Sequence, residues 1–211
     1  AVVAVAMKLL LGRRCPPILA KISNDLVRRD FPPPIRAAYR CWLRIQGLAI
    51  DHFVGMAEAM RGEIASAMRV PPRRISIIDN PALDAARFDT LRAAGAARSQ
   101  AAVGRRFLAV GRLVRQKNFA MLLRAFAAGA GPEDRLTILG EGPEPRRLAR
   151  LARRLGLAGR VAMPGHEADI ARWAGTSDIL LLSSDYEGVP AEVIEALAAG
   201  LPIVATDCSA A

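Results

Sequence analysis

Two glutamates separated by seven residues, Glu187 and Glu195, are the side chains whose spacing most clearly suggests chemistry. The apolar run 179–182 before them predicts a buried strand, Pro190 fits the first turn of a helix, and Gly200 fits the position just after that helix ends. Unpaired N–H groups at the start of a helix attract phosphate. Carboxylates accept hydrogen bonds from sugar hydroxyls. The pattern therefore predicts a site for a molecule that is both phosphorylated and polyhydroxylated.

Two cations follow an earlier apolar run, 107–110, in the segment Gly111-Arg112-Leu-Val-Arg-Gln-Lys117. An arginine can hold phosphate oxygens with two parallel hydrogen bonds, and a lysine adds a point charge. Fixed cations of this kind stabilise negative charge on phosphate groups. We expect Arg112 and Lys117 to do this, with two solvated surface cations as the alternative. Arg115 is expected to be a surface residue.

The elements around these residues predict an α/β domain. Five apolar runs alternate with helical segments, which indicates a parallel, doubly wound sheet with right-handed crossovers. With the strand order 3-2-1-4-5, the first and fourth strands meet at the switch point, where ligands bind. This topology would bring Arg112 and Lys117 beside Glu187 and the helix from Pro190. The five runs are 107–110, 136–139, 161–163, 179–182 and 203–205.

The segment from Glu187 to Thr206 resembles the E-x7-E segment of the retaining, nucleotide-sugar-dependent glycosyltransferases of family 4. Glu-Gly-x-Pro opens it and Ala-x-Gly-x-Pro follows it, and Gly-Arg-Leu-x-x-Gln-Lys-Asn from Gly111 resembles the phosphate-binding segment of that family. The resemblance covers about residues 48–211, with specific motifs in 107–207. It implies the GT-B fold, which has two Rossmann-like doubly wound domains, here with an incomplete N-terminal domain and a truncated C-terminal domain.

The resemblance also implies roles for single residues. Arg112 and Lys117 would bind the diphosphate, Glu187 the transferred sugar and Glu195 the ribose hydroxyls. Residues 161–166 would hold the base through their backbone. His166 is expected to be a loop residue and Glu192 to face solvent. Further residues expected to contact the donor are Gly111, Gly142, Gly188, Val189 and Pro190.

The implied reaction moves a sugar from a UDP- or GDP-linked donor to a glycan or lipid-linked acceptor with retention of configuration. The chain has no Asp-x-Asp pair, so we expect neither a metal nor another cofactor. Two alternatives stay open: a non-catalytic subunit that binds sugar nucleotides, and a nucleotide-sugar epimerase of the same architecture.

The amino-acid composition indicates which classes of binding partner and which cellular compartment to expect. The net charge of +10, from 30 Lys and Arg against 20 Asp and Glu, is explained equally well by coding bias and by selection for a partner. A positive surface favours acidic acceptors or peripheral contact with an anionic membrane. Aromatic residues make up only 5%, which disfavours nucleic acid. The cysteines Cys15, Cys41 and Cys208 form no C-x-x-C pair, which predicts reduced thiols and a cytoplasmic protein, with the inner membrane face as an option. The apolar start, 1–11, contains Lys8 and is too short to span a bilayer.

The domain organisation predicted from the sequence has three parts. Residues 1–81 would be the remainder of an acceptor-side domain, 82–106 an interdomain linker rich in Ala, Arg and Gly, and 107–211 the donor domain. The chain begins without Met and ends just after a strand pattern, so we expect a piece of a longer protein that is inactive on its own. In the first part we expect strands at 17–22, 48–54 and 75–78 and helices at 39–46 and 57–68.

Overall fold

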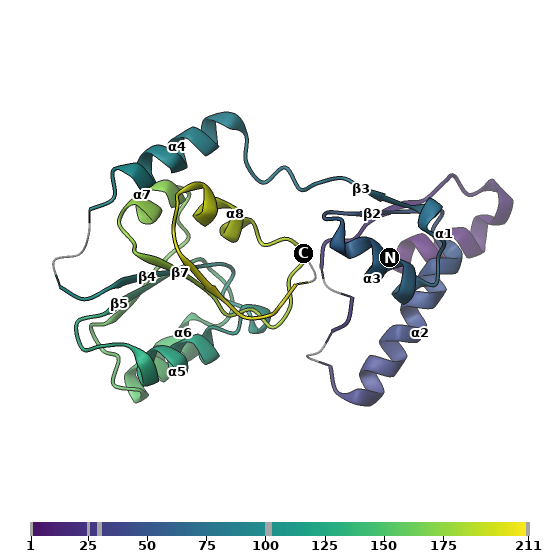
Figure 1. Ribbon diagram of the computed structural model, residues 1–211. Coiled ribbons are helices and arrows are strands. Elements are labelled where there is room, and N and C mark those ends of the chain that lie inside the picture. The colour runs from purple at the N-terminus through teal and green to yellow at the C-terminus, as the bar shows by residue number, and fades with distance from the viewer. Residues whose placement is uncertain (1, 25, 29–30, 100–102, 210–211) are drawn as a thin grey trace. The chain divides into compact units, whose positions relative to one another are not determined.

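The computed structural model describes residues 2–24, 26–28, 31–99 and 103–209 (Figure 1). The chain divides into two compact units. The N-terminal unit comprises Ala1–Asn80, Tyr186–Val189 and Cys208–Ala211, and the C-terminal unit comprises Pro81–Asp185 and Pro190–Asp207. Two short segments from the end of the chain therefore group with the N-terminal unit.

The N-terminal unit is built on a three-stranded parallel sheet in the order β1-β2-β3. Its core joins the sheet to two helices through buried side chains such as Leu43, Phe53 and Ile64. The elements are α1 (Val2–Leu11), η1 (Gly12–Arg14), β1 (Leu19–Lys21), α2 (Pro33–Ala49), β2 (His52–Gly55), α3 (Ala59–Met68), η2 (Pro72–Arg74) and β3 (Ile75–Ile77).

One boundary in this unit differs from the expected one. The strand expected at 48–54 begins only at His52, because helix α2 continues through Ala49. The Ile50 N–H still donates to the Gln46 carbonyl at 2.9 Å, and pairing with the first strand starts when the Asp51 N–H donates to the Ile18 carbonyl at 3.0 Å. The apolar residues Leu48 and Ala49 belong to the end of helix α2. A short apolar run in a sequence does not distinguish a helix end from a strand.

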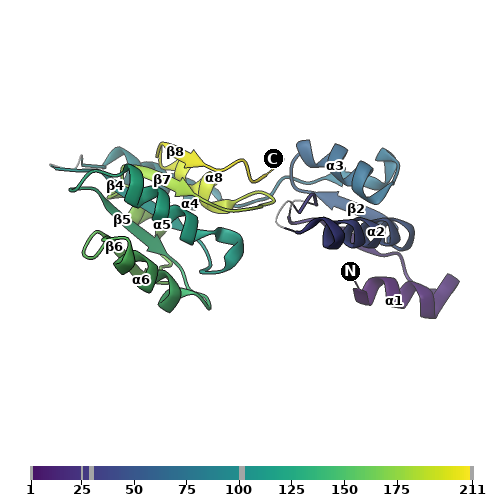
Figure 2. The same ribbon diagram turned by 90° about the horizontal axis from the view of Figure 1, so that it is seen from below.

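The C-terminal unit holds a five-stranded parallel sheet in the order β6-β5-β4-β7-β8 (Figure 2). In chain order this is 3-2-1-4-5, so the predicted topology is confirmed. Helices α5 and α6 cover one face and α4, α7 and α8 cover the other. The elements are α4 (Ala85–Ala96), β4 (Arg106–Val110), η3 (Arg115–Lys117), α5 (Phe119–Gly129), β5 (Arg135–Leu139), α6 (Pro145–Arg154), β6 (Val161–Gly165), α7 (Ile170–Gly175), β7 (Ile179–Leu182), α8 (Ala191–Ala198) and β8 (Ile203–Ala205).

Helix α4 occupies most of the segment 82–106 that the sequence suggested as a linker. Asp84 caps it by accepting a hydrogen bond from the Arg87 N–H at 2.7 Å. Its Leu91 is fully buried in the core that α4 shares with α7 and α8. The expectation of a linker across this segment is therefore corrected: the helix is part of the C-terminal unit.

Helix α8 ends as its sequence predicts and begins at Ala191, one residue after the proline that was expected in its first turn. Pro190 is the N-cap, and the helix closes with two hydrogen bonds, from the Gly200 N–H to the Leu197 carbonyl and from the Leu201 N–H to the Ala196 carbonyl. This is the pattern of a Schellman motif, in which the residue after the cap takes the left-handed conformation. Gly200 has φ +60°, which costs least for glycine.

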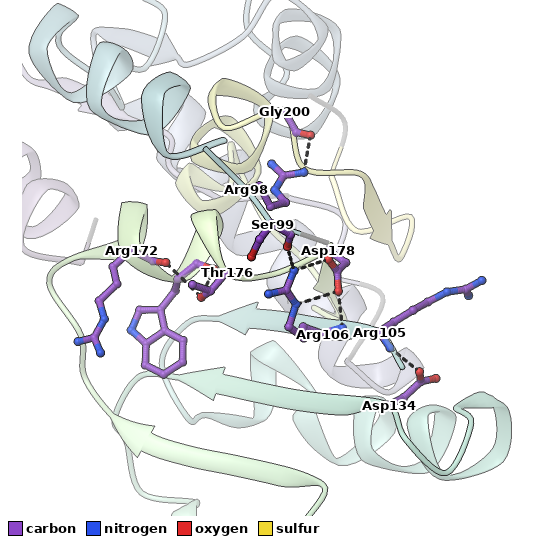
Figure 3. Close-up of polar contacts among 10 residues, drawn as sticks. Arg98, Ser99, Arg105, Arg106, Asp134, Arg172, Thr176, Asp178 and Gly200 are labelled. Atoms are coloured by element: carbon purple, nitrogen blue, oxygen red, sulfur yellow. Dashed lines mark hydrogen bonds and ion pairs between the residues drawn. The ribbon is translucent and has the colours of Figure 1, made fainter. Parts of the chain in front are cut away.

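An ion pair joins the start of the central strand to the residue before β7. The guanidinium of Arg106 donates to both carboxylate oxygens of Asp178, at 3.1 and 2.8 Å, and the Arg106 N–H donates to the same carboxylate at 2.7 Å (Figure 3). These charge-assisted bonds hold the pKa of Asp178 below its ordinary value, against the opposing effect of burial. The pair fixes the pairing of β4 with β7 at its amino end.

Candidate functional site

A cavity of about 690 Å³ opens in the C-terminal unit at the carboxyl ends of β4 and β5. The carboxyl edge beside the central strand is where a doubly wound sheet binds its ligands. The lining includes two cations, three carboxylates and several backbone segments. The lining residues are Arg87, Val110, Gly111, Arg112, Leu139, Gly140, Glu141, Gly142, His166, Glu167, Ala168, Ile170 and Glu195.

The loops that follow β4 and β5 pack together without side chains between them. A Cβ added to Gly140 would lie 2.0 Å from the Gly111 carbonyl oxygen, so only glycine fits there. The Leu113 N–H donates to the Glu141 carbonyl at 2.7 Å, which ties the two loops together, and Gly142 follows at the same edge of the cavity. Gly111, Gly140 and Gly142 all line the cavity, so backbone atoms form part of its wall on this side.

Arg112 and Lys117 both follow β4, but their surroundings differ. Arg112 is exposed and lines the cavity. Lys117 lies in the turn η3, with its aliphatic stem against Gly111, and only 12% of its side chain is exposed. The Ser183 hydroxyl, at the end of β7, donates to the Lys117 carbonyl at 2.7 Å. The predicted meeting of the segments after β4 and β7 therefore occurs.

The expectation that Glu192 faces solvent is wrong. Its side chain is 12% exposed, and its Oε1 accepts a hydrogen bond from the Lys117 ammonium at 2.5 Å. Glu192 lies in the first turn of α8, where the helix dipole also favours a negative charge. No local pattern indicates this pair, because the two residues are 75 positions apart.

Glu195 stands in the wall of the cavity, one turn further along α8. Its side chain is 18% exposed, and its Oε1 lies 3.4 Å from Nη2 of Arg87, which projects from α4. Sequence reasoning missed Arg87, because it lies in the segment interpreted as a linker. The one local signal was Asp84 three residues earlier, a residue type that favours helix starts.

Three of the predicted residues group with the N-terminal unit: Glu187, Gly188 and Val189. Glu187 is buried, with 8% of the residue exposed. Its backbone N–H donates to the Cys208 carbonyl at 2.6 Å. Val189 packs against the core of that unit. Pro190 and Glu195 belong to the C-terminal unit, so the chain passes from one unit to the other within the segment that holds the two glutamates.

Across residues 2–24, 26–28, 31–99 and 103–209, no group of three or more His, Cys, Asp or Glu side chains is arranged to hold a metal ion. In the same part of the chain, no helix combines the length and the apolar character needed to cross a membrane. His166 is exposed on the loop after β6, as expected for a loop residue.

Comparison with known proteins identifies the family. The family described as "Glycosyl transferases group 1" matches residues 104–211, which contain the whole of the cavity except Arg87. The chain belongs to this family. As a group 1 glycosyltransferase it has the GT-B type of fold, so the resemblance noted in the sequence is confirmed at that level.

Two curated relatives of this glycosyltransferase each align with about half of the chain. An uncharacterized glycosyltransferase of Methanocaldococcus jannaschii is 36% identical over 104 residues, which is 48% of this chain and 26% of the relative. The lipopolysaccharide core biosynthesis glycosyltransferase LpsE of Rhizobium meliloti is 34% identical over 99 residues, 47% of this chain and 28% of LpsE. The chain therefore spans less than a third of these two relatives.

A solved structure extends the likeness to both units. The crystal structure of HepE from Anabaena, in complex with UDP and glucose, superposes with a TM-score of 0.71 at 20% identity. The match covers 99% of this glycosyltransferase chain and 57% of HepE. At this identity the similarity establishes a shared fold.

Proposed function

We propose that the protein takes part in transferring a sugar from a nucleoside diphosphate sugar to a glycan or lipid-linked acceptor, and that the cavity beside β4 binds the donor. The observation that carries the proposal is the single cavity that joins Arg112, the glycine-lined loops and Glu195. A guanidinium suits a diphosphate and a carboxylate suits a diol. The known relatives support the same class, since HepE was crystallised with UDP and glucose and LpsE acts in lipopolysaccharide core biosynthesis.

The proposed roles follow from the chemistry of each group. Arg112 holds the diphosphate oxygens, and the N–H groups at the start of α8, after Pro190, add a positive dipole end. Glu195 accepts from the ribose hydroxyls, and the backbone after β6 borders the base. Lys117 supplies a second positive charge once the diphosphate competes with Glu192. A UDP- or GDP-linked donor fits these contacts.

We also propose that transfer retains the configuration of the sugar. The bond between the anomeric carbon and the diphosphate oxygen breaks, and the acceptor oxygen forms its bond on the same face. The acceptor's proton passes to the departing diphosphate oxygen, so no side-chain nucleophile is required. Fixed cations stabilise the charge that accumulates on the diphosphate. Glu187 is proposed to contact the transferred sugar; Glu187→Gln is then expected to lower turnover more than donor affinity.

Calorimetric titration with UDP, GDP and ADP, beside an assay for nucleotide released from UDP- and GDP-sugars, tests the proposal. We expect UDP or GDP to bind and nucleotide to be released when an acceptor is added to the complete enzyme. Binding without release under any acceptor would favour a non-catalytic subunit, and isomerised donor without release would favour an epimerase. Absence of nucleotide binding would overturn the proposal.

Metal independence is part of the proposal, because cations of the chain take the place that a bound metal would occupy beside the diphosphate. Activity is then expected to survive EDTA. Loss of activity on chelation, restored by Mn²⁺ or Mg²⁺, would overturn it.

For the setting of the reaction, we propose the cytoplasm, with peripheral contact between the enzyme and an anionic membrane. In the part of the chain that the structure describes, Cys15, Cys41 and Cys208 are not joined by disulfides, which suits a reducing compartment. Helix α6 adds exposed cations that anionic lipid attracts. They are Arg146, Arg147, Arg150, Arg153 and Arg154. Sedimentation with vesicles of anionic lipid, but not with neutral vesicles, is the expected result.

A further inference from the structure

Helix α4 is fastened along helix α8, which carries Glu195. Near the end of α4, a Cβ added to Gly95 would lie 2.0 Å from the Ala199 carbonyl oxygen, so the two helices touch through their backbones. Arg98 then donates to the carbonyls of Ala199 and Gly200, at 2.5 and 3.2 Å, and so caps the end of α8; Figure 3 shows the bond to Gly200. The position of α4 on α8 is thereby fixed at one end.

At the other end of α4, Arg87 reaches the donor cavity. Its backbone is set by the Asp84 cap, and its Nη2 lies 3.4 Å from Oε1 of Glu195. The side chains of Arg87 and Glu195 are 30% and 18% exposed, and both line the cavity. A guanidinium anchored on a capped helix holds a carboxylate more rigidly than a freely rotating surface cation would.

The contact between Arg87 and Glu195 affects how well the Glu195 carboxylate can bind the ribose hydroxyls. Its 2′- and 3′-hydroxyls lie on adjacent carbons, so one carboxylate binds both only when it is ionised and correctly rotated. A guanidinium that donates to Oε1 fixes the rotation of the carboxylate. Loss of that donor would leave the carboxylate with more rotamers to lose when the ligand binds.

We propose that Arg87 is a positioning residue of the donor site, which orients Glu195 toward the ribose hydroxyls of the nucleotide; this rests on the proposed function. Helix α4 is then part of the donor site. Arg87 acts through Glu195, so its effect depends on the ribose hydroxyls and on the presence of that carboxylate.

The test compares UDP with 2′,3′-dideoxy-UDP, and GDP with its dideoxy analogue, by calorimetry on the wild type, Arg87→Ala, Glu195→Ala and the double variant. We expect Arg87→Ala to raise the Kd of the ribonucleotide about tenfold, the usual size for losing a charged hydrogen bond. The Kd of the dideoxy analogue is expected to change less than about twofold. The double variant is expected to match Glu195→Ala, because the two residues act as one unit.

Arg92→Ala is the matched control, since Arg92 lies on the same helix and pairs on the surface with Asp89 at 3.2 Å. It is expected to leave both Kd values unchanged. If Arg87→Ala does not fold, as judged by circular dichroism, Arg87→Gln carries the same comparison.

Three outcomes would overturn the inference. An Arg87 variant with unchanged ribonucleotide affinity would show that the contact between Arg87 and Glu195 does not contribute to nucleotide binding. Equal weakening of the ribonucleotide and the dideoxy analogue would show that Arg87 binds phosphate or base directly. Additive losses in the double variant would show independent roles. If the proposed function itself were wrong, neither UDP nor GDP would bind to the wild-type protein. This result differs from the three outcomes above, all of which require the wild type to bind a nucleotide.

Discussion

Arg112 and Lys117 follow the same strand, yet one is exposed at the cavity and the other is mostly buried beside Glu192. Arg112 stands exposed at the cavity, whereas Lys117 must exchange the Glu192 carboxylate for another anion to bind a diphosphate. The two cations should therefore contribute differently to ground-state binding. Substitution of Arg112, and separately of Glu192, the partner of Lys117, can distinguish the contributions of the two cations.

Arg112→Ala is expected to lower turnover of the complete enzyme about a hundredfold or more, because a charge that stabilises the departing diphosphate is lost. Nucleotide release from the donor is the measurement. Arg115→Ala is the control, since Arg115 is an exposed arginine in the same loop. A turnover unchanged within about twofold for Arg112→Ala would contradict the role of this guanidinium.

Glu192→Gln is expected to tighten UDP binding about fivefold, because the Lys117 ammonium loses the carboxylate that competes with the diphosphate. Calorimetry at low salt measures this, where the charge is least screened. Glu133→Gln is the control, because Glu133 pairs with Arg135 on the surface at 3.7 Å. Weaker binding by Glu192→Gln would indicate that Glu192 instead holds Lys117 in its binding position.

At the scale of single elements, α8 depends on a C-terminal glycine. A Cβ added to Gly200 would meet no other atom, but the residue has φ +60°. A Cβ added to Gly129, at the end of α5, would also meet no other atom, and this residue has no positive φ. These two glycines separate backbone conformation from steric contact.

Gly200→Ala is expected to destabilise the C-terminal unit by about 1 kcal/mol, since the left-handed conformation is strained for a residue with a Cβ. Gly129→Ala is expected to be neutral or to stabilise by up to about 1 kcal/mol. Urea unfolding followed by the fluorescence of Trp173, in a Trp42→Phe background, measures the difference. Equal effects of both substitutions would show that the conformation of Gly200 is unimportant.

On the scale of the whole molecule, each unit has its own sheet, its own core and at least one carboxyl group whose pKa is lowered. In the N-terminal unit, the Lys8 ammonium and the Ile18 N–H lower the pKa of Asp51. In the C-terminal unit, the Arg105 N–H lowers the pKa of Asp134 and the Arg106 side chain lowers that of Asp178. A depressed carboxyl pKa contributes stability above the unfolded value of about 3.9, and that stability is lost as the pH falls through the folded value. Both units should therefore weaken below about pH 4.

Asp178→Asn is expected to destabilise the C-terminal unit by about 2 kcal/mol at pH 7, because charge-assisted bonds to Arg106 are lost. The loss of stability below about pH 4 should also become shallower, since one depressed carboxyl no longer titrates. Urea unfolding between pH 3 and 7, followed at Trp173, measures both effects. Asp89→Asn is the control, because its pair with Arg92 is exposed, and an equal loss in both variants would contradict the prediction.

Local patterns in the sequence determined most of the C-terminal unit. Its five strands are short apolar runs, their alternation with helices implies the strand order, and Gly200 and Pro202 mark the end of α8. These signals are local because a strand's burial and a helix's cap depend on residues a few positions apart. Arg112, Lys117 and Glu195 were selected as candidate site residues in the same way, from their place after a strand or on a helix.

Only the tertiary structure decided the partners of those residues. Arg87 and Glu195 are 108 positions apart, and the mixed Ala and Arg composition of α4 shows no apolar stripe that would mark it as a packed helix. Its place depends on small residues that let backbones touch, as at Gly95, and on one buried leucine. The Lys117–Glu192 pair likewise forms because the sheet brings the turn η3, after β4, close to the first turn of α8, after β7. Such contacts depend on three-dimensional packing, so no pattern along the chain predicts them.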